Sequence, residues 1–405
     1  MYNSAENAPA PPPPSAVAAE TDRGNESMQE TTEMTFPGFV DVHVHFRDSG
    51  APDSETTASG LAAARRGGFA AVVTMPNTNP ACDSPEGIEY QRLAARAARS
   101  ETILLPSACI TKGRLGREVA DLEALAGAGA AFFTDDGSYV ADDAVMEEAM
   151  RRAAKLGLCI CQHAMDPRET GRGVIRDCAF ARAHRLPTIP VSAETTAIRR
   201  DLALCRVTGC RLHVQHLSTA EGVELVRSAQ REGLPVTAEA TPHHLLLSCD
   251  EIPGDDANYK MAPPLGTAED RAELRRAVKE GALMFATDHA PHSAARKAGG
   301  FAGAANGIVG LETAIPLTWT AMVEEEGMDP EAWARAWWKM PRSILSARAS
   351  KRLESAPGTR IAVGEWRVVD VAGFASRSRN CPYDGWESRC WPVSESIRIR
   401  PKGMP

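Results

Sequence analysis

The stretch Pro37-Gly-Phe-Val-Asp-Val-His-Val-His-Phe-Arg47 places two histidines two residues apart in a short apolar run. Alternate side chains of a β-strand point to the same face, so His43 and His45 can bind one metal ion together. The same run begins an alternation of short apolar segments and longer amphipathic segments that continues to about Leu345. This alternation predicts parallel strands that are joined by helices.

Eight strands are expected in this region. They are Gly38–His45, Ala70–Met75, Thr102–Cys109, Ala131–Thr134, Leu158–His163, Arg211–His216, Pro235–Ala240 and Leu283–Asp288. Helical patterns lie between them, at Ser59–Arg66, Ile88–Arg99, Asp142–Lys155, Ser192–Thr208, Ala220–Arg231 and Glu269–Glu280. Eight strand–helix units over roughly 250 to 300 residues fit a closed (β/α)8 TIM-like barrel, and a doubly wound open sheet is the alternative.

Chemically competent residues follow seven of the eight strands, and they favour the barrel. These residues are His43, His45, Asn77, Asp135, Asp136, His163, His216, His243, His244 and Asp288. The carboxyl ends of barrel strands meet at one mouth, whereas an open sheet would spread these side chains along a line. Imidazoles and carboxylates without thiolates suit zinc or a similar divalent ion. His184 and His213 are expected to be structural, and the roles of His243 and His244 stay open.

The two ends of the chain differ in composition from the barrel region. Residues 1–36 contain a Pro/Ala run and few β-branched or aromatic residues, so we expect a disordered segment without strands. Beyond Leu345, short strands are expected at Thr359–Val363, at Trp366–Val371 and near Ser394–Ile399. The predicted organisation is a disordered segment over 1–36, a barrel over 37–345 and a small β appendage over 346–405.

The overall composition excludes several function classes. The 405 residues carry a formal net charge of −8, which argues against nucleic-acid and anionic-membrane partners. No apolar stretch approaches the roughly 18 residues of a membrane span, and no secretory signal is recognisable. The ten cysteines are scattered and form no CxxC pair, which indicates reduced thiols in the cytoplasm.

Several motifs, in order along residues 37 to 400, resemble those of class I dihydroorotases in the amidohydrolase superfamily. Besides the opening strand they are Met75-Pro-Asn-Thr-Asn-Pro80, Thr134-Asp-Asp-Gly137, Gln215-His-Leu-Ser-Thr219, Ala286-Thr-Asp-His-Ala-Pro-His292, Gly307-Ile-Val-Gly-Leu-Glu-Thr313 and Ser378-Arg-Asn380. The resemblance implies a zinc-dependent cyclic amidase that interconverts L-dihydroorotate and N-carbamoyl-L-aspartate, the third step of pyrimidine synthesis.

The resemblance also implies the roles of the metal-site residues. One or two zinc ions would be held by His43, His45, Asp136, His163, His216 and Asp288. Asp136 would take the bridging place of the carboxylated lysine found in many relatives, while Asp135 is expected to be structural. A metal-bound hydroxide would attack the ring amide, and Asp288 would act as general base and then as general acid.

A further set of residues is expected to bind the substrate. Arg47 lies two residues past His45 and would pair with the substrate carboxylate. His45, Asn77 and His292 match substrate-binding positions of the family. Asn306 and Gly307 replace a Phe-Gly pair that binds through its backbone, so that contact should survive.

Two departures from the family keep other interpretations open. Ala262 and Gly266 stand where the family has a substrate-binding asparagine and an arginine. The strands that relatives carry before the barrel are not apparent in residues 1–36, which would leave sheet edges exposed for a partner. One alternative is therefore a weakly active or non-catalytic subunit of an aspartate transcarbamoylase complex. Another is a cyclic amidase for a different ureide ring, such as a hydantoinase or allantoinase, although those usually carry the lysine. A homo-oligomer is also expected.

Overall fold

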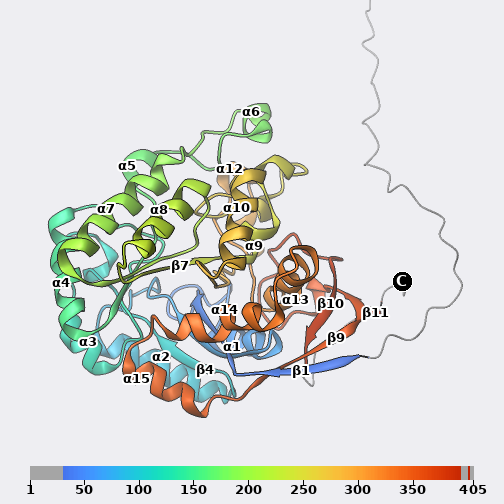
Figure 1. The fold of residues 1–405 in the computed structure, drawn as a ribbon, viewed down its shortest axis with the longest axis horizontal. Coiled ribbons are helices and arrows are strands. Elements are labelled where there is room, and N and C mark those ends of the chain that lie inside the picture. The colour runs from blue at the N-terminus through green and yellow to red at the C-terminus, as the bar shows by residue number, and fades with distance from the viewer. Residues whose placement is uncertain (1–30, 394–399, 402–405) are drawn as a thin grey trace, which may run out of the picture.

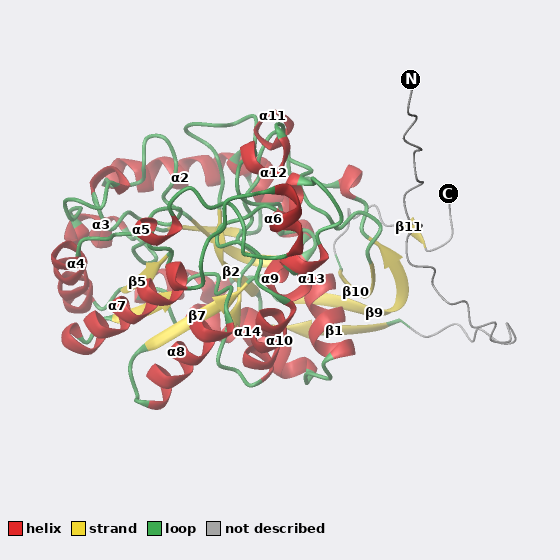
Figure 2. Ribbon diagram, turned by 90° about the horizontal axis from the view of Figure 1, so that it is seen from above, coloured by secondary structure: helices red, strands yellow, loops and turns green. Residues whose placement is uncertain are grey.

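The computed structural model describes residues 31–393 and 400–401 of the chain. A ring of parallel strands is surrounded by helices, and an antiparallel sheet packs at one side of it (Figures 1 and 2). Among the helices of these residues, none combines the length and apolar character needed to cross a membrane. The (β/α)8 class expected from the sequence is confirmed.

Seven regular strands and one irregular segment form the ring. The strands are β2 (Phe39–Val44), β3 (Phe69–Thr74), β4 (Ile103–Pro106), β5 (Cys159–Gln162), β6 (Arg211–Val214), β7 (Val236–Ala240) and β8 (Met284–Phe285). The expected strand Ala131–Thr134 contributes only single bridges, which run from Phe133 to Ala108 and Ile160 and so link the β4 and β5 sides. A bridge between Val44 and His289 joins the last strand to the first.

The helices follow the amphipathic segments of the sequence. They are α1 (Thr57–Arg66), α2 (Pro85–Ala98), α3 (Leu122–Ala128), α4 (Asp143–Leu156), α5 (Pro167–Thr170), α6 (Ala179–His184), α7 (Ser192–Thr208), α8 (Ala220–Arg231), α9 (Pro242–Leu246), α10 (Ala268–Lys279), α11 (Ala294–Lys297), α12 (Gly300–Gly303), α13 (Ala314–Thr318), α14 (Pro330–Arg342) and α15 (Ala347–Arg352), with a π-helix at Trp319–Glu325. Side-chain caps start several of them, and Thr267 forms a capping box with Asp270 at α10.

Helix α14 covers the seam where the ring closes. Its Trp337 stacks on Phe285 of β8 with ring centroids 4.9 Å apart. Its Trp333 meets Phe39 of β2 edge-on at 5.5 Å. Because both indoles are fully buried, one helix seals the junction between the first and last strands.

The last residue of α14 and the segment after it close the end of the barrel at which the strands begin. Arg342 donates to the carbonyl of Gly38, Ser346 to those of Ala130 and Ala131, and Arg352 to that of Leu104. Each acceptor precedes or lies early in a strand of the ring. The opposite end, at which the strands finish, is therefore the end available for chemistry.

The antiparallel sheet differs in part from the expected β appendage. It contains β1 (Thr32–Phe36), β9 (Thr359–Val368), β10 (Glu387–Pro392) and β11 (Arg400–Pro401), and β9 pairs with each of the other three. The two strands expected at Thr359–Val363 and Trp366–Val371 are instead mainly one long strand. The sequence analysis did not predict β10, and the strand expected near Ser394–Ile399 lies outside the described residues.

The expectation that residues 1–36 lack strands is wrong for their last five residues. Thr32–Phe36 is too short and polar to show an apolar run, and it forms a strand because β9 offers backbone groups to pair with. Since β1 lines one edge of β9, the argument that a missing strand calls for a partner does not hold. Residues 1–30 lie outside the described part, and the limits 37–345 and 346–405 stay predictions, with β1 belonging to the sheet.

Phe36 anchors β1 to the barrel and offers a test of this arrangement. It is 3% exposed and lies 5.8 Å from the Phe39 ring and 6.4 Å from the Trp333 ring. We expect Phe36→Ala to lower the free energy of unfolding by about 3 to 5 kcal/mol, measured by urea denaturation. Leu115→Ala, at a side chain that is 69% exposed, should change it by less than about 0.5 kcal/mol. Equal effects of the two variants would contradict the packing described.

Candidate active site

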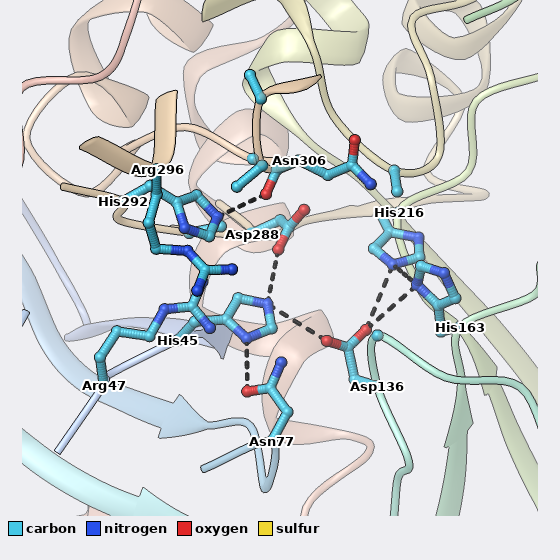
Figure 3. A pocket seen from close by; sticks show the side chains of 16 residues that line it. His45, Arg47, Asn77, Asp136, His163, His216, Asp288, His292, Arg296 and Asn306 are labelled. Atoms are coloured by element: carbon cyan, nitrogen blue, oxygen red, sulfur yellow. Dashed lines mark hydrogen bonds and ion pairs between the residues drawn. The ribbon is translucent and has the colours of Figure 1, made fainter. Parts of the chain in front are cut away.

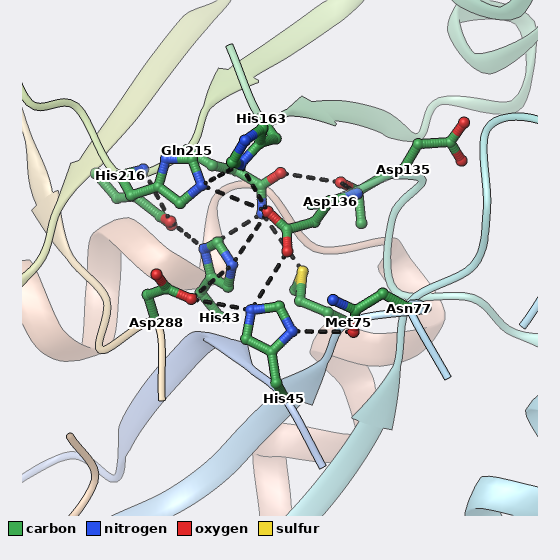
Figure 4. A network of polar contacts seen from close by, with 12 residues as sticks. His43, His45, Met75, Asn77, Asp135, Asp136, His163, Gln215, His216 and Asp288 are labelled. Atoms are coloured by element: carbon green, nitrogen blue, oxygen red, sulfur yellow. Dashed lines mark hydrogen bonds and ion pairs between the residues drawn. The ribbon is translucent and has the colours of Figure 1, made fainter. Parts of the chain in front are cut away.

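Six predicted metal ligands meet at the carboxyl ends of the strands (Figure 4). His43 lies in β2, His45 follows it, and His163 directly follows β5. Asp136, His216 and Asp288 lie two or three residues beyond their strands or bridges. All six are buried, the most exposed being His163 at 8%.

Asp136 is at the centre of this group. Its Oδ1 lies 3.4 Å from His43 Nε2, 3.4 Å from His216 Nε2 and 3.5 Å from His163 Nδ1. Its Oδ2 lies 3.3 Å from His45 Nε2. One carboxylate thus faces four imidazoles that come from three different strands of the barrel.

Asp288 faces two of these histidines, His43 and His45. Its Oδ1 is 2.9 Å from His45 Nε2 and 3.5 Å from His43 Nε2. Two overlapping groups can hold a cation, since within each the ligating atoms lie within 4.8 Å of one another. These groups are His43, Asp136 and His216, and His43, His45 and Asp288.

Two buried polar atoms that lack hydrogen-bond partners show that the residues fit a divalent cation. Within the described part of the chain, the buried atoms His43 Nε2 and Asp136 Oδ1 have no hydrogen-bond partner. Buried polar atoms are normally satisfied, and a cation between a carboxylate and imidazole nitrogens would satisfy both. Nδ1 of His163 also lies only 2.8 Å from Nε2 of His216, so two nitrogens converge on one small region.

The electrostatics favour the metal-ligating forms of the two carboxylates and of two of the histidines. Burial alone would raise the pKa of Asp136, but His43, His163 and His216 hold it well below its usual range. The same balance, with His43 and His45 as partners, lowers the pKa of Asp288. Burial lowers the pKa values of His45 and His163 and so favours neutral imidazoles. The pKa of His43 differs: burial would lower it, but the carboxylates of Asp136, Glu239 and Asp288 hold it well above its ordinary value. Because a ligating imidazole must be neutral, a cation bound here would displace the proton of His43 Nε2.

A buried carboxylate behind His43 was missed by the sequence analysis. His43 Nδ1 donates to Glu239 Oε1 at 2.5 Å, and His213 Nε2 donates to Glu239 Oε2 at 2.9 Å. This contact fixes the ring of His43 so that its Nε2 faces Asp136 and Asp288. The available signal was a glutamate inside the apolar run Pro235–Ala240, where a charge needs a buried partner. His213 itself does not line the cavity at the barrel mouth and also contacts the hydroxyl of Thr237.

The backbone at the end of two strands is strained. His216 and Asp288 have φ values of 34° and 47°, in the left-handed region that side chains other than glycine rarely adopt. Next to Asp288, Thr287 donates its backbone N–H to Asp41 at 3.0 Å and also contacts Asp41 through its hydroxyl. Asp41 therefore joins the start of the barrel to its last strand and holds Asp288 in place.

The mouth opens into a cavity of about 370 Å³ (Figure 3). Every predicted site residue except His43 lines it, and His43 is fully buried. Arg47, Arg296 and His292 approach from the side opposite His163 and His216. The cavity therefore has the predicted metal ligands at one end. At the other end the guanidiniums of Arg47 and Arg296 form a cationic wall.

The predicted substrate-binding residues differ in their freedom to contact a ligand. Arg47 donates from Nε to the carbonyl of Pro291 at 3.3 Å, and its remaining N–H groups stay available. Asn77 Oδ1 accepts from His45 Nδ1 at 2.9 Å, so this side chain also orients a predicted metal ligand. His292 Nε2 donates to the carbonyl of Asn306 at 2.7 Å, and burial lowers the pKa of His292 to about 3, which keeps it neutral.

Gly307 must be glycine at the cavity wall. Its φ is 111°, and a Cβ there would lie 2.5 Å from that of Ala290. Lys297 Nζ donates to the carbonyls of Ala305 and Gly307, both at 3.0 Å, and so holds this loop against the cavity.

Most of the other residues considered from the sequence do not line the cavity. Ala262 lines the cavity but Gly266 does not, and a Cβ at Gly266 would lie 2.5 Å from the carbonyl oxygen of Ser218. His243 and His244 do not line it, and His244 is held by Thr241 and the carbonyl of Pro263. Asp135 accepts from the backbone of residues 110 and 111, in agreement with a structural role, and the exposed His184 contacts the carbonyl of residue 180.

Arg296 is a lining residue that the sequence analysis did not identify. Within the described residues its side chain has no hydrogen bond or ion pair, and it adds a second guanidinium beside Arg47. Its position could be recognised from the sequence only by its closeness to His292, four residues earlier.

Comparisons with known proteins agree with the geometry. A family model described as "Dihydro-orotase-like" matches residues 32–222. The dihydroorotase of Bacillus caldolyticus is 45% identical over 366 residues, which cover 89% of this chain and 85% of that protein. The chain belongs to the dihydroorotase family. The dihydroorotase of Geobacillus sp. strain WCH70 is also similar, with 42% identity over 92% of this chain and 88% of that protein.

Solved structures with low sequence identity support the fold. The L-hydantoinase of Arthrobacter aurescens superimposes with a TM-score of 0.74 at 24% identity, covering 92% of this chain and 85% of that one. The Saccharomyces cerevisiae dihydroorotase in complex with 5-fluoroorotic acid gives a TM-score of 0.67 at 17% identity, covering 91% and 99%. These dihydroorotase and hydantoinase neighbours have the barrel architecture expected from the motifs.

The carboxylate behind His43 predicts a pH-dependent contribution to stability. Burial would raise the pKa of Glu239, but His43 and His213 outweigh it and lower the pKa from 4.5 to about 2. A depressed folded-state pKa contributes stability above pH 4.5 that is lost as the pH falls towards 2. In metal-free protein, Glu239→Gln should therefore lower the free energy of unfolding by about 3 kcal/mol at pH 6 and by progressively less below pH 4.5, measured by urea denaturation.

The exposed Glu224→Gln variant is the control, because its side chain is 60% exposed and only pairs with Arg231. Its effect should stay below about 1 kcal/mol at every pH. A Glu239→Gln effect that does not change between pH 6 and pH 3 would contradict the ion-pair description.

Proposed function

We propose that this protein is a zinc-dependent dihydroorotase. It hydrolyses the cyclic amide of L-dihydroorotate to N-carbamoyl-L-aspartate and catalyses the reverse ring closure. The observation that carries the proposal is the convergence of His43, His163 and His216 on one carboxylate oxygen of Asp136, at the mouth of a barrel of the dihydroorotase family.

The cation would be held by the six converging residues His43, His45, Asp136, His163, His216 and Asp288. When bound there, zinc supplies Lewis acidity, which lowers the pKa of water and polarises the amide carbonyl. Zinc is the choice because all the candidate donors are imidazole nitrogens or carboxylate oxygens, a donor set that suits this ion.

Asp288 moves the proton. Its carboxylate is ionised and lines the cavity, so it can accept a proton from the attacking water as the new C–O bond forms. It returns that proton to the ring nitrogen as the C–N bond breaks, and the product leaves as a ureido acid. The strained backbone at this residue and its support through Thr287 and Asp41 fix the carboxylate at the mouth.

Arg47 selects the substrate. It lies in the cationic wall of the cavity with Arg296, and a guanidinium pairs with a carboxylate through two parallel hydrogen bonds. Dihydroorotate carries a ring carboxylate, whereas hydantoin and dihydrouracil do not. The backbone of Asn306 and Gly307, held by His292 and Lys297, would meet the ring beside it. This wall favours dihydroorotate over the neutral ureides, even though Ala262 lacks an amide.

The cysteines bear on the cellular location of the protein. All ten cysteines are buried and unpaired, which favours a reducing compartment, the cytoplasm. A homo-oligomer remains a prediction, as does a complex with aspartate transcarbamoylase, which the resemblance implies.

The proposal as a whole is tested by metal analysis and an activity assay on the same preparation. Zinc-loaded protein should consume dihydroorotate and form it from carbamoyl aspartate, followed by ultraviolet absorbance, and a chelator should stop both reactions. Absence of turnover in protein that contains zinc would reject it.

Removal of the proton carrier should separate chemistry from binding. We expect Asp288→Asn to lower kcat by at least about 100-fold, because general acid–base catalysis contributes factors of that order. Asp177→Asn, at an exposed carboxylate paired with Arg182, should leave kcat unchanged within about twofold. Zinc content measured for both variants shows whether the loss is chemical, and full activity of Asp288→Asn would remove Asp288 from the mechanism.

The carboxylate contact of Arg47 should appear in substrate preference. We expect Arg47→Ala to lower kcat/KM for dihydroorotate by about 10- to 100-fold, in line with about 1.5 to 3 kcal/mol for a charged hydrogen bond. Arg47→Lys should fall between, since an ammonium cannot pair bidentately. Any residual turnover of dihydrouracil should not fall, because that ring has no carboxylate. Equal losses for both rings would contradict this role.

A further inference from the structure

A second cavity, of about 380 Å³, lies at the end of the barrel remote from the site described above. It is lined by the last turns of α2, the start of β4 and α15, whose labels lie together at the lower edge of Figure 1. Helix α2 packs on β4, and Arg352 of α15 donates to the carbonyl of Leu104 in β4. Here the strands begin, whereas the metal-site residues lie where they end. No part of the proposed reaction uses this cavity.

Four arginines surround it: Arg92, Arg96, Arg348 and Arg352. Glu89 is paired with one of them, its Oε2 lying 3.8 Å from Arg92 Nη1. Within residues 31–393, the guanidiniums of Arg96, Arg348 and Arg352 have no carboxylate within ion-pair distance. Because the whole chain carries a net charge of −8, this is a local concentration of positive charge on an acidic protein.

The guanidiniums are close enough to repel one another. Burial lowers the pKa of Arg352, and the charges of Arg92, Arg96 and Arg348 lower it further. Burial and the charges of Arg348 and Arg96 also lower the pKa of Arg92, despite the nearby Glu89. An anion placed among them would relieve this repulsion.

Three of the arginines are held in place by the backbone. Arg348 donates to the carbonyl of Gly127 at 2.7 Å, Arg352 to that of Leu104 at 3.1 Å, and Arg92 to that of Gly129 at 3.4 Å. Each guanidinium has five N–H groups, so most remain available to a ligand. Arg92 and Arg348 have a structural role, because they cap the carboxyl end of α3. This capping role does not explain the presence of Arg96 or Arg352 at the cavity.

We propose that this cavity is a binding site for a polyphosphate group, such as the triphosphate of a nucleotide. Planar guanidiniums match phosphate oxygens bidentately, and four of them around one hollow exceed what a single phosphate needs. The volume lies within the usual range of small-molecule sites. Ile103 and Leu104 add an apolar wall beside the charges.

Isothermal titration calorimetry of the full-length, zinc-loaded protein with sodium tripolyphosphate tests the proposal. We expect binding by the wild type that weakens at least tenfold in the double variant Arg96→Ala/Arg352→Ala. The control Arg335→Ala/Lys339→Ala removes two positive charges from exposed positions of α14 and should bind within twofold of the wild type. Zinc content after titration, and a parallel titration of metal-free protein, show that the heat does not come from chelation.

Further titrations show which compound the cavity prefers and whether the measured binding occurs in this cavity or in the active site. Tighter binding of ATP than of tripolyphosphate would identify a nucleotide, and equal binding would identify the polyphosphate group alone. The proposal is overturned if wild-type protein shows no binding at millimolar tripolyphosphate, or if inorganic phosphate binds equally well. It is also overturned if Arg47→Ala/Arg296→Ala abolishes binding while Arg96→Ala/Arg352→Ala retains it, because the anion would then occupy the active site. None of these outcomes depends on catalytic activity.

Discussion

The need to neutralise one buried carboxylate controls the arrangement of this protein. Asp136 is 2% exposed, and an isolated charge at that depth would be very costly. Imidazoles from β2, from the end of β5 and from the segment after β6 surround it, and a cation among them would complete the compensation. These residues are far apart in the chain, so the compensation exists only when the ring of strands is closed. Folding and assembly of the site are therefore the same event.

The two ends of the barrel divide the work of stability and chemistry. At the end where the strands begin, the segment from Arg342 to Arg352 covers the ring and satisfies carbonyls of several strands. At the other end the backbone is strained at His216 and Asp288, and buried charges remain without ordinary partners. Functional sites commonly tolerate such strain because the surrounding structure holds them in place. The tryptophans of α14 provide part of that support by sealing the seam.

Support behind the site is as specific as the site itself. Glu239 orients His43, Asn77 orients His45, and Asp41 with Thr287 places Asp288. On the cationic side, Lys297 and His292 hold the loop at Asn306 and Gly307. Ala262 lines the cavity without a hydrogen-bonding side chain, while Arg47 and Arg296 make another part of the wall positively charged.

The barrel class, the order of its strands and five of the ligand candidates could be predicted from the sequence, because period-two and helical patterns and the His-x-His pair are local signals. The choice of Asp136 over Asp135 came from the family resemblance. Strand Thr32–Phe36, the single long strand Thr359–Val368, and the roles of Glu239 and Arg296 could not. A strand with little apolar content forms only when a neighbouring strand offers backbone partners, as β9 does for β1. Whether a buried glutamate or a surface arginine faces a site depends on segments more than 100 residues away, and only the closed barrel brings those segments together.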